Sequence, residues 1–152
     1  MKIQIRKGVF ETNSSSVHSL VVSKTEDYEG FQKGTMWARD EEDLMPMDEA
    51  IEYNIKVLKD RDYTNEEFFK LYREKKNFWD AFSAMYDEND ESKYADWEEF
   101  KDEYEVDSCY SYYLPWDEYW DSDYMQYYES YSRDIVTEHG DKITVWGYYG
   151  HD

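Results

Sequence analysis

The chain has little of several things: among its 152 residues are one cysteine, two prolines and six glycines. A single cysteine excludes a disulfide within the chain and fits a reducing compartment. No apolar run approaches the roughly 20 residues that a membrane-spanning helix needs. The first residues also lack the apolar core of a secretory signal peptide. The sequence therefore predicts a protein of the cell interior.

Positive charge is also scarce, with 17 Lys and Arg against 37 Asp and Glu, for a net charge of −20. The chain lacks the basic surface that direct nucleic-acid binding requires. Self-repulsion at this net charge opposes folding. Two explanations remain open: solubility or adaptation to high salt, and recognition of a basic partner.

The negative charge is concentrated in residues 86–129, where sixteen carboxylates and two lysines give a local net charge of −14. Acidic tails are usually poor in aromatic residues and disordered. This stretch instead contains the rings of Trp97, Phe100, Tyr104, Trp116, Tyr119, Trp120, Tyr124 and Tyr127. Each ring buries about 150–250 Å². We therefore expect the stretch to fold and to present a dense acidic surface.

Strands are predicted near both ends of the chain. The alternation at residues 2–6 and the apolar run at residues 19–23 each predict a strand, with a polar loop over residues 8–18 between them. Residues 134–137 and 142–146 flank a His-Gly-Asp turn. This pattern predicts a β-hairpin.

Helical spacing of apolar residues predicts four helices between these strands. The first covers residues 48–59. The second begins at Thr64 with a Thr-Asn-Glu-Glu capping box and continues to Tyr86. Ser92 is expected to cap the third helix, and Pro115 to lie in the first turn of the fourth.

The order of these elements predicts an α+β fold. A small antiparallel sheet, built from the N-terminal strands and the C-terminal hairpin, is expected to pack against the central helical region. We expect one domain over residues 1–152, with the acidic and aromatic helical segment at about residues 86–131 inside it.

Residues 8–20 form a second unusual segment, Gly-Val-Phe-Glu-Thr-Asn-Ser-Ser-Ser-Val-His-Ser-Leu. It resembles a signature, G-x-F-E-T-N-S-S-S-x-H-S, found near the N-terminus of small proteins encoded by bacteriophages and some Firmicutes. The match covers about a tenth of the chain. The resemblance implies a phage or prophage origin, and hence a place in the cytoplasm of a bacterial host, but it implies no particular activity.

This segment has two interpretations. In the first, its backbone amides and hydroxyls bind an anion, or Glu11, Ser15 and His18, with Asn13 beside them, supply the acid–base and nucleophilic groups of a small enzyme. In the second, the same side chains hydrogen-bond their own backbone in a tight turn. The glycine patterns of a P-loop and of a nucleophile elbow are both missing, which favours the turn.

Metal and cofactor sites have weak support in the sequence. One cysteine and three scattered histidines show no ligand spacing. The acidic run at residues 87–91 lacks the glycine and the distal glutamate of an EF-hand loop. We expect no resident metal and no cofactor.

The leading hypothesis is an acidic, phage-encoded protein that inhibits a host nucleic-acid-binding protein, such as a defence nuclease, by occupying its basic surface as DNA does. Carboxylates three or four residues apart on a helix lie about 5–6 Å apart, and such a row imitates a row of phosphates. The expected contact residues are Glu91, Glu98, Asp102, Glu105, Asp117, Asp121 and Asp123, with Tyr112 and Tyr113 as exposed rings.

Other rings are assigned by the same reasoning. Tyr128, Tyr148 and Tyr149 are expected at the surface, whereas Trp97 and Trp120 are expected in the core. The alternative functions are a small enzyme or nucleotide-binding protein that uses the N-terminal segment, and a structural component of the virion.

Overall fold

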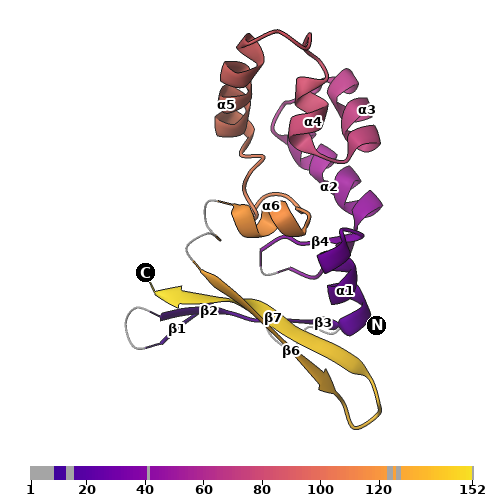
Figure 1. Cartoon of the computed structure of the whole chain (residues 1–152), viewed down its shortest axis with the longest axis vertical. Coiled ribbons are helices and arrows are strands. Elements are labelled where there is room, and N and C mark those ends of the chain that lie inside the picture. Colours follow the sequence, from indigo (N-terminus) through magenta and orange to yellow (C-terminus); the bar gives the residue numbers. More distant parts are fainter. Residues whose placement is uncertain (1–8, 13–15, 41, 123–124, 126–127, 152) are drawn as a thin grey trace.

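The structure is a computed structural model that describes residues 9–12, 16–40, 42–122, 125 and 128–151. In chain order the elements are β1 (Val9–Thr12), β2 (Ser16–Ser19), β3 (Val21–Lys24), α1 (Thr25–Lys33), β4 (Met36–Trp37), β5 (Met45–Pro46), α2 (Met47–Asp60), α3 (Glu66–Lys75), α4 (Phe78–Ser83), α5 (Ser92–Tyr104), α6 (Trp116–Asp121), β6 (Glu129–Val136) and β7 (Lys142–His151). Figure 1 shows the main sheet at one end of the molecule and the helices at the other. The predicted α+β class is confirmed. None of the helices in these ranges is long and apolar enough to cross a membrane.

Strand β7 is the centre of the main sheet. Strand β6 pairs along one of its edges, while β2 and β3 share the other edge and β1 lies outside β2. All of these pairings are antiparallel. The predicted C-terminal hairpin is therefore confirmed, and it is longer than predicted. The strand predicted at residues 2–6 lies outside the described residues.

The predicted loop over residues 8–18 is wrong in part, because β1 and β2 pair as a hairpin within it. The register places Phe10 opposite His18 and Glu11 opposite Val17. β-Branched and aromatic residues such as Val9, Phe10 and Val17 are common in strands, and they favour this pairing over an irregular loop.

The junction between β2 and β3 passes close over Gly147. A Cβ atom at this position would lie 2.2 Å from the carbonyl oxygen of Ser19, so only glycine leaves room for that carbonyl. Tyr131, the cross-strand partner of Gly147, donates its hydroxyl to the same oxygen. Gly147 leaves room for the Ser19 carbonyl and Tyr131 binds it, so these two residues keep the β2–β3 junction in contact with β7.

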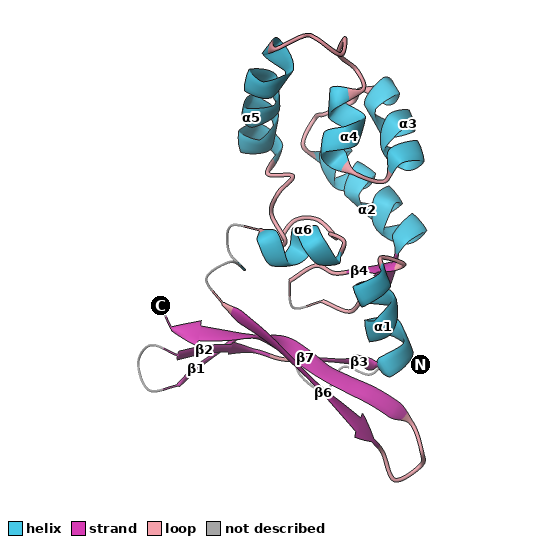
Figure 2. Ribbon diagram, in the orientation of Figure 1, coloured by secondary structure: helices cyan, strands magenta, loops and turns pink. Residues whose placement is uncertain are grey.

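An aromatic core lies between the sheet and helices α1 and α6, which Figure 2 shows above the strands. Trp146 of β7 is fully buried. Its ring centre lies 5.4 Å from that of Phe31 and 6.3 Å from that of Tyr119. The predicted surface position of Tyr148 is wrong, because this ring is 0% exposed, whereas Tyr149 is 39% exposed as predicted. Alternation along β7 explains the difference between the two neighbours.

Helix α1 is not predicted by the sequence pattern. Gly30 lies inside it, and glycine disfavours a helix by about 1 kcal/mol relative to alanine. Two buried rings outweigh this cost, since Tyr28 and Phe31 both pack between α1 and the sheet, against Trp146. Tertiary packing therefore decides the structure of this segment.

The predicted helix from Thr64 to Tyr86 is wrong in two respects. Its cap is Asn65, whose side-chain oxygen accepts the Phe68 N–H at 3.2 Å. The helix also ends after Lys75, because Lys76 adopts a left-handed conformation with φ of 60°. A second asparagine, Asn77, then caps α4 by accepting the Asp80 N–H at 2.9 Å. Asparagine is among the strongest helix N-caps, so two asparagines separate two helices.

Helix α2 confirms the prediction at residues 48–59 and carries one fully buried amide, Asn54. The Asn54 side chain donates to the Tyr72 hydroxyl at 2.9 Å and to the Tyr113 carbonyl at 2.8 Å, and it accepts the Tyr113 N–H at 2.9 Å. Three segments distant in sequence thus meet at one side chain.

Candidate acidic interface

Helix α5 separates aromatic from acidic residues. On its inner face Phe100 is 6% exposed, and Trp97 is partly buried beside it. Both rings contact Phe82 of α4, at centre distances of 5.1 and 5.2 Å. Trp97 and, on α6, Trp120 pack against the core as predicted. The outer face of α5 carries exposed carboxylates.

The start of α5 is fixed by acidic side chains. Asp90 accepts the Ser92 backbone N–H at 3.0 Å and its hydroxyl at 2.6 Å, and these bonds lower the pKa of Asp90. Ser92 is therefore the first helical residue and not the cap that the sequence predicts. One turn later Asp96 accepts the Tyr86 hydroxyl at 2.8 Å, which ties α5 to the chain after α4.

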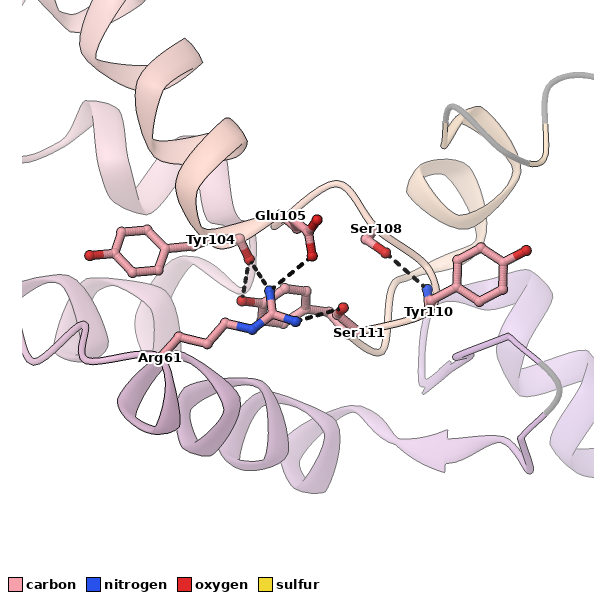
Figure 3. A network of polar contacts seen from close by, with 7 residues as sticks. Arg61, Tyr104, Glu105, Ser108, Tyr110 and Ser111 are labelled. Carbon is pink, nitrogen blue, oxygen red and sulfur yellow. Dashed lines mark hydrogen bonds and ion pairs between the residues drawn. The ribbon is translucent and has the colours of Figure 1, made fainter.

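Arg61 holds the other end of α5, as Figure 3 shows. Its guanidinium donates to the Tyr104 carbonyl at 2.6 Å and to the Ser111 hydroxyl at 2.9 Å. A cation at the C-terminus of a helix also interacts favourably with the helix dipole. Arg61 follows directly after α2, so one side chain connects α2, the end of α5 and the segment that follows.

The predicted contact residues Glu91, Glu98, Asp102, Glu105, Asp117 and Asp121 are all exposed, and Asp123 lies outside the described residues. Two of them have cationic neighbours: Glu98 lies 3.1 Å from Lys101, and Glu105 lies 3.5 Å from Arg61. The Glu98 and Glu105 side chains still keep 67% and 62% of their exposure. Exposed ion pairs contribute about 0–1 kcal/mol, so both carboxylates can exchange these partners for others.

The predicted surface position of Tyr112 and Tyr113 is wrong, because the two rings are 0% and 6% exposed. The Tyr112 hydroxyl donates to the Tyr104 carbonyl at 2.7 Å, and the Tyr113 ring packs edge-on against another ring 5.0 Å away. Burial raises the pKa of Tyr112 to about 12. Tyr128, also predicted at the surface, is half-buried. Among the described residues of the acidic stretch, the exposed rings are Tyr94 and Tyr110, at 58% and 48% exposure.

Glu118, on the short helix α6, is a partly buried and hydrogen-bonded carboxylate that the sequence pattern does not predict. Its carboxylate accepts the Asn77 side-chain N–H at 2.9 Å. Burial raises the pKa of Glu118 to about 7, with the charges of Asp80 and Asp117 adding to the effect and the Asn77 hydrogen bond opposing it. The sequence offers no local signal for it, because Glu118 and Asp121 are three residues apart and share one side of α6.

A cavity of about 190 Å³ opens beside Glu118. It is lined by Phe78, Trp97, Val106, Asp107, Leu114, Glu118, Asp121 and Ser122. The cavity therefore lies between α4, α5 and α6, and its lining carboxylates are Asp107, in the segment between α5 and α6, and Glu118 and Asp121, on α6.

Replacement of Glu118 by glutamine is expected to stabilise the protein above pH 7. Burial disfavours the ionised Glu118 carboxylate in the folded state. The free energy of unfolding of the wild type therefore falls as pH rises from about 4.5, the ordinary pKa of a glutamate, to about 7, the pKa of Glu118 in the folded protein. Glutamine keeps the oxygen that Asn77 binds, and it removes a penalty of about 3 kcal/mol at pH 8. Urea unfolding at pH 5 and pH 8 checks this. The gain should fall to about 1 kcal/mol or less at pH 5, and an exposed control, Glu74→Gln, should show none at either pH; equal gains at both pH values would contradict the assignment.

The N-terminal candidates are not assembled into a site by the described backbone. Glu11 and His18 are not cross-strand partners in the β1–β2 register, and Ser15 lies outside the described residues. In the part of the chain that the structure describes, no group of three His, Cys, Asp or Glu side chains is placed to hold a metal ion. No protein-family model, curated protein or solved structure matches the chain. The acidic surface is therefore the stronger candidate.

Proposed function

We propose that the chain is a phage-encoded inhibitor that acts in the cytoplasm of a bacterial host. It binds a basic, nucleic-acid-binding host protein, such as a defence nuclease, and occupies the surface that DNA otherwise contacts. The row of exposed carboxylates from Glu91 to Glu105 is the observation that carries this proposal. The phage setting comes from the N-terminal resemblance at residues 8–20.

The charge density of this row supports DNA mimicry. Six exposed carboxylates lie between Glu91 and Glu105, a distance of about 21 Å at the helical rise. This is about one carboxylate per 3.5 Å, close to the spacing of roughly 3.4 Å per phosphate along one strand of B-DNA. Lys101, 3.1 Å from Glu98, offsets part of this negative charge. The two lysines of α5 lie near rings, with Lys93 Nζ 5.4 Å from the centre of Tyr94 and Lys101 Nζ 6.0 Å from that of Trp97.

Rigid placement of the row is the second support. The aromatic inner face of α5, the Tyr86–Asp96 hydrogen bond and the Arg61 contacts hold both ends of the helix. Preorganised charges lose less conformational entropy on binding than charges on a disordered tail. The exposed rings of Tyr94 and Tyr110 add apolar contact area of the kind found in interface anchors.

Reversal of two charges on α5, Glu98→Lys with Asp102→Lys, is expected to weaken binding of the host partner about tenfold or more, because both carboxylates would face its basic surface. The matched control is Glu74→Lys with Glu138→Lys, which makes the same change in net charge at exposed positions on α3 and in the β6–β7 turn. Tagged wild type and both variants are used to capture host proteins, and the affinity of the captured protein is then titrated. Equal losses in the two variants would refute a localised interface.

Competition distinguishes mimicry from other acidic binding. Duplex DNA should displace the captured protein from the wild-type chain, and salt approaching 1 M should release it, because exposed charges are screened within about 3 Å at that concentration. A complex that DNA leaves intact would contradict the proposal. An enzyme that uses Glu11, Ser15 and His18 would instead keep its activity at high salt.

A further inference from the structure

The cavity beside Glu118 differs in kind from the outer face of α5, which carries exposed carboxylates. Its wall combines the apolar side chains of Phe78, Val106 and Leu114 with the indole of Trp97, and carboxylates lie at its polar side. At about 190 Å³ it is smaller than the roughly 300–1,000 Å³ of typical small-molecule sites. Its size suits one side chain, and not a nucleotide or a cofactor.

The charge of the lining selects the occupant. Two larger hollows, of about 460 and 480 Å³, each mix carboxylates with two lysines, Lys24 and Lys142 in one, Lys75 and Lys93 in the other. The cavity beside Glu118 is lined by three carboxylates and, among the described lining residues, by no lysine or arginine. It therefore favours a cation with an apolar stem.

We infer that this cavity receives one arginine side chain of the basic partner, with the guanidinium against the Glu118 carboxylate and the methylene stem along Trp97 and Leu114. This inference rests on the proposed function, since it names the residue by which the partner is anchored. A guanidinium forms bidentate bonds with carboxylates and stacks on aromatic rings, whereas an ammonium does neither as well.

Both walls of the cavity are held in position before binding. Asn77 uses its oxygen to cap α4 and its N–H group to fix Glu118. The Trp97 ring is fixed by Phe82, Phe100 and Trp79, at centre distances of 5.2, 5.7 and 5.3 Å. A preorganised pocket at the centre of an interface is the usual environment of an arginine hot spot.

Binding should depend on pH, because the guanidinium requires an ionised Glu118. The charged groups that face it are Asp80 from α4, Asp107 from the α5–α6 segment, and Asp117 and Asp121 on its own helix. With a pKa of about 7 for Glu118, affinity for arginine should rise about tenfold between pH 6 and pH 8.

The test titrates the whole protein with N-acetyl-L-arginine amide and follows the assigned Trp97 indole N–H by NMR. N-acetyl-L-citrulline amide, which has the same shape without the charge, is the ligand control. We expect saturable binding of the arginine probe, a loss of at least tenfold in Glu118→Gln at pH 8, and no loss in the exposed control Glu74→Gln. The variant should also lose the pH dependence. Because Glu118→Gln is expected to be more stable than wild type, unfolding would not explain its loss.

Absence of saturable binding, equal binding of the citrulline probe, or unchanged binding by Glu118→Gln would each overturn the inference. A second arm asks whether Glu118→Gln weakens capture of the host partner; unchanged capture would overturn the anchoring role. The probe titration needs no partner. If the α5 charge reversal leaves capture intact while the arginine probe binds, the proposed function fails and an arginine site remains.

Discussion

Gly147→Ala is expected to destabilise the protein by roughly 3 kcal/mol or more, at the upper end for overpacking of a core. The added methyl group would meet the Ser19 carbonyl at 2.2 Å, and this neighbour is backbone that cannot rotate away. Relief requires β7 to separate from the β2–β3 junction, which also breaks the Tyr131 hydrogen bond. Urea unfolding of the variant beside wild type measures the loss.

Gly30→Ala is the matched control for this substitution. A Cβ at residue 30 also makes short contacts, at 2.7 Å with Met36 Cγ and at 2.8 Å with Thr35 Oγ1, but these are side-chain atoms that can shift by a rotamer change and not backbone. Residue 30 is helical, so alanine gains up to about 1 kcal/mol of helix propensity. This gain offsets part of the cost of shifting the two side chains, so we expect a loss of about 1 kcal/mol, smaller than that of Gly147→Ala. Similar losses in the two alanine variants would show that the Ser19 carbonyl does not limit residue 147.

Asn54→Leu is expected to cost roughly 4 kcal/mol. Leucine fills a similar volume but leaves the Tyr113 N–H, the Tyr113 carbonyl and the Tyr72 hydroxyl buried without their partner. Each buried group left unsatisfied costs about 1–3 kcal/mol. Chemical unfolding measures the effect, and Asn89→Leu at an exposed position should be nearly neutral.

A double-mutant cycle refines this prediction. Tyr72→Phe removes only one of the three bonds and should cost about 1 kcal/mol alone. In the Asn54→Leu background the same change should cost less or even stabilise, because it removes an orphaned hydroxyl. Strict additivity of the two changes would mean that the Asn54–Tyr72 hydrogen bond contributes nothing to stability.

The elements that the sequence predicts well are those whose signals are local. The β-branched alternation around residues 142–146 and the apolar spacing of residues 48–59 each bury a continuous face, and both elements are found. The break at Lys76 has no such signal, because apolar spacing continues on both sides of it. There the left-handed Lys76 ends α3 and the Asn77 cap starts α4, and these two residues decide the outcome.

The candidate site could be predicted only in outline. Exposure of the α5 carboxylates follows from composition and helical period, and it is found. The Ser-Tyr-Tyr run at residues 111–113 has the composition of a surface loop, but Asn54, 59 residues earlier in the chain, binds the backbone of Tyr113 and draws it inward. That Glu118 and Asp121 line the cavity, and Asp117 does not, depends likewise on packing against α4 and α5.

The topology of the main sheet has a consequence for how the protein is made on the ribosome. Val21 pairs with Trp146, 125 residues later in the chain. Strands β2 and β3 leave the ribosome early, but their shared partner β7 is synthesised only near the end of the chain. Synthesis at about 5–20 residues per second makes this wait several seconds or longer, while a helix forms within about a microsecond. The helical half that carries the acidic surface can therefore fold first, and the sheet closes last around β7.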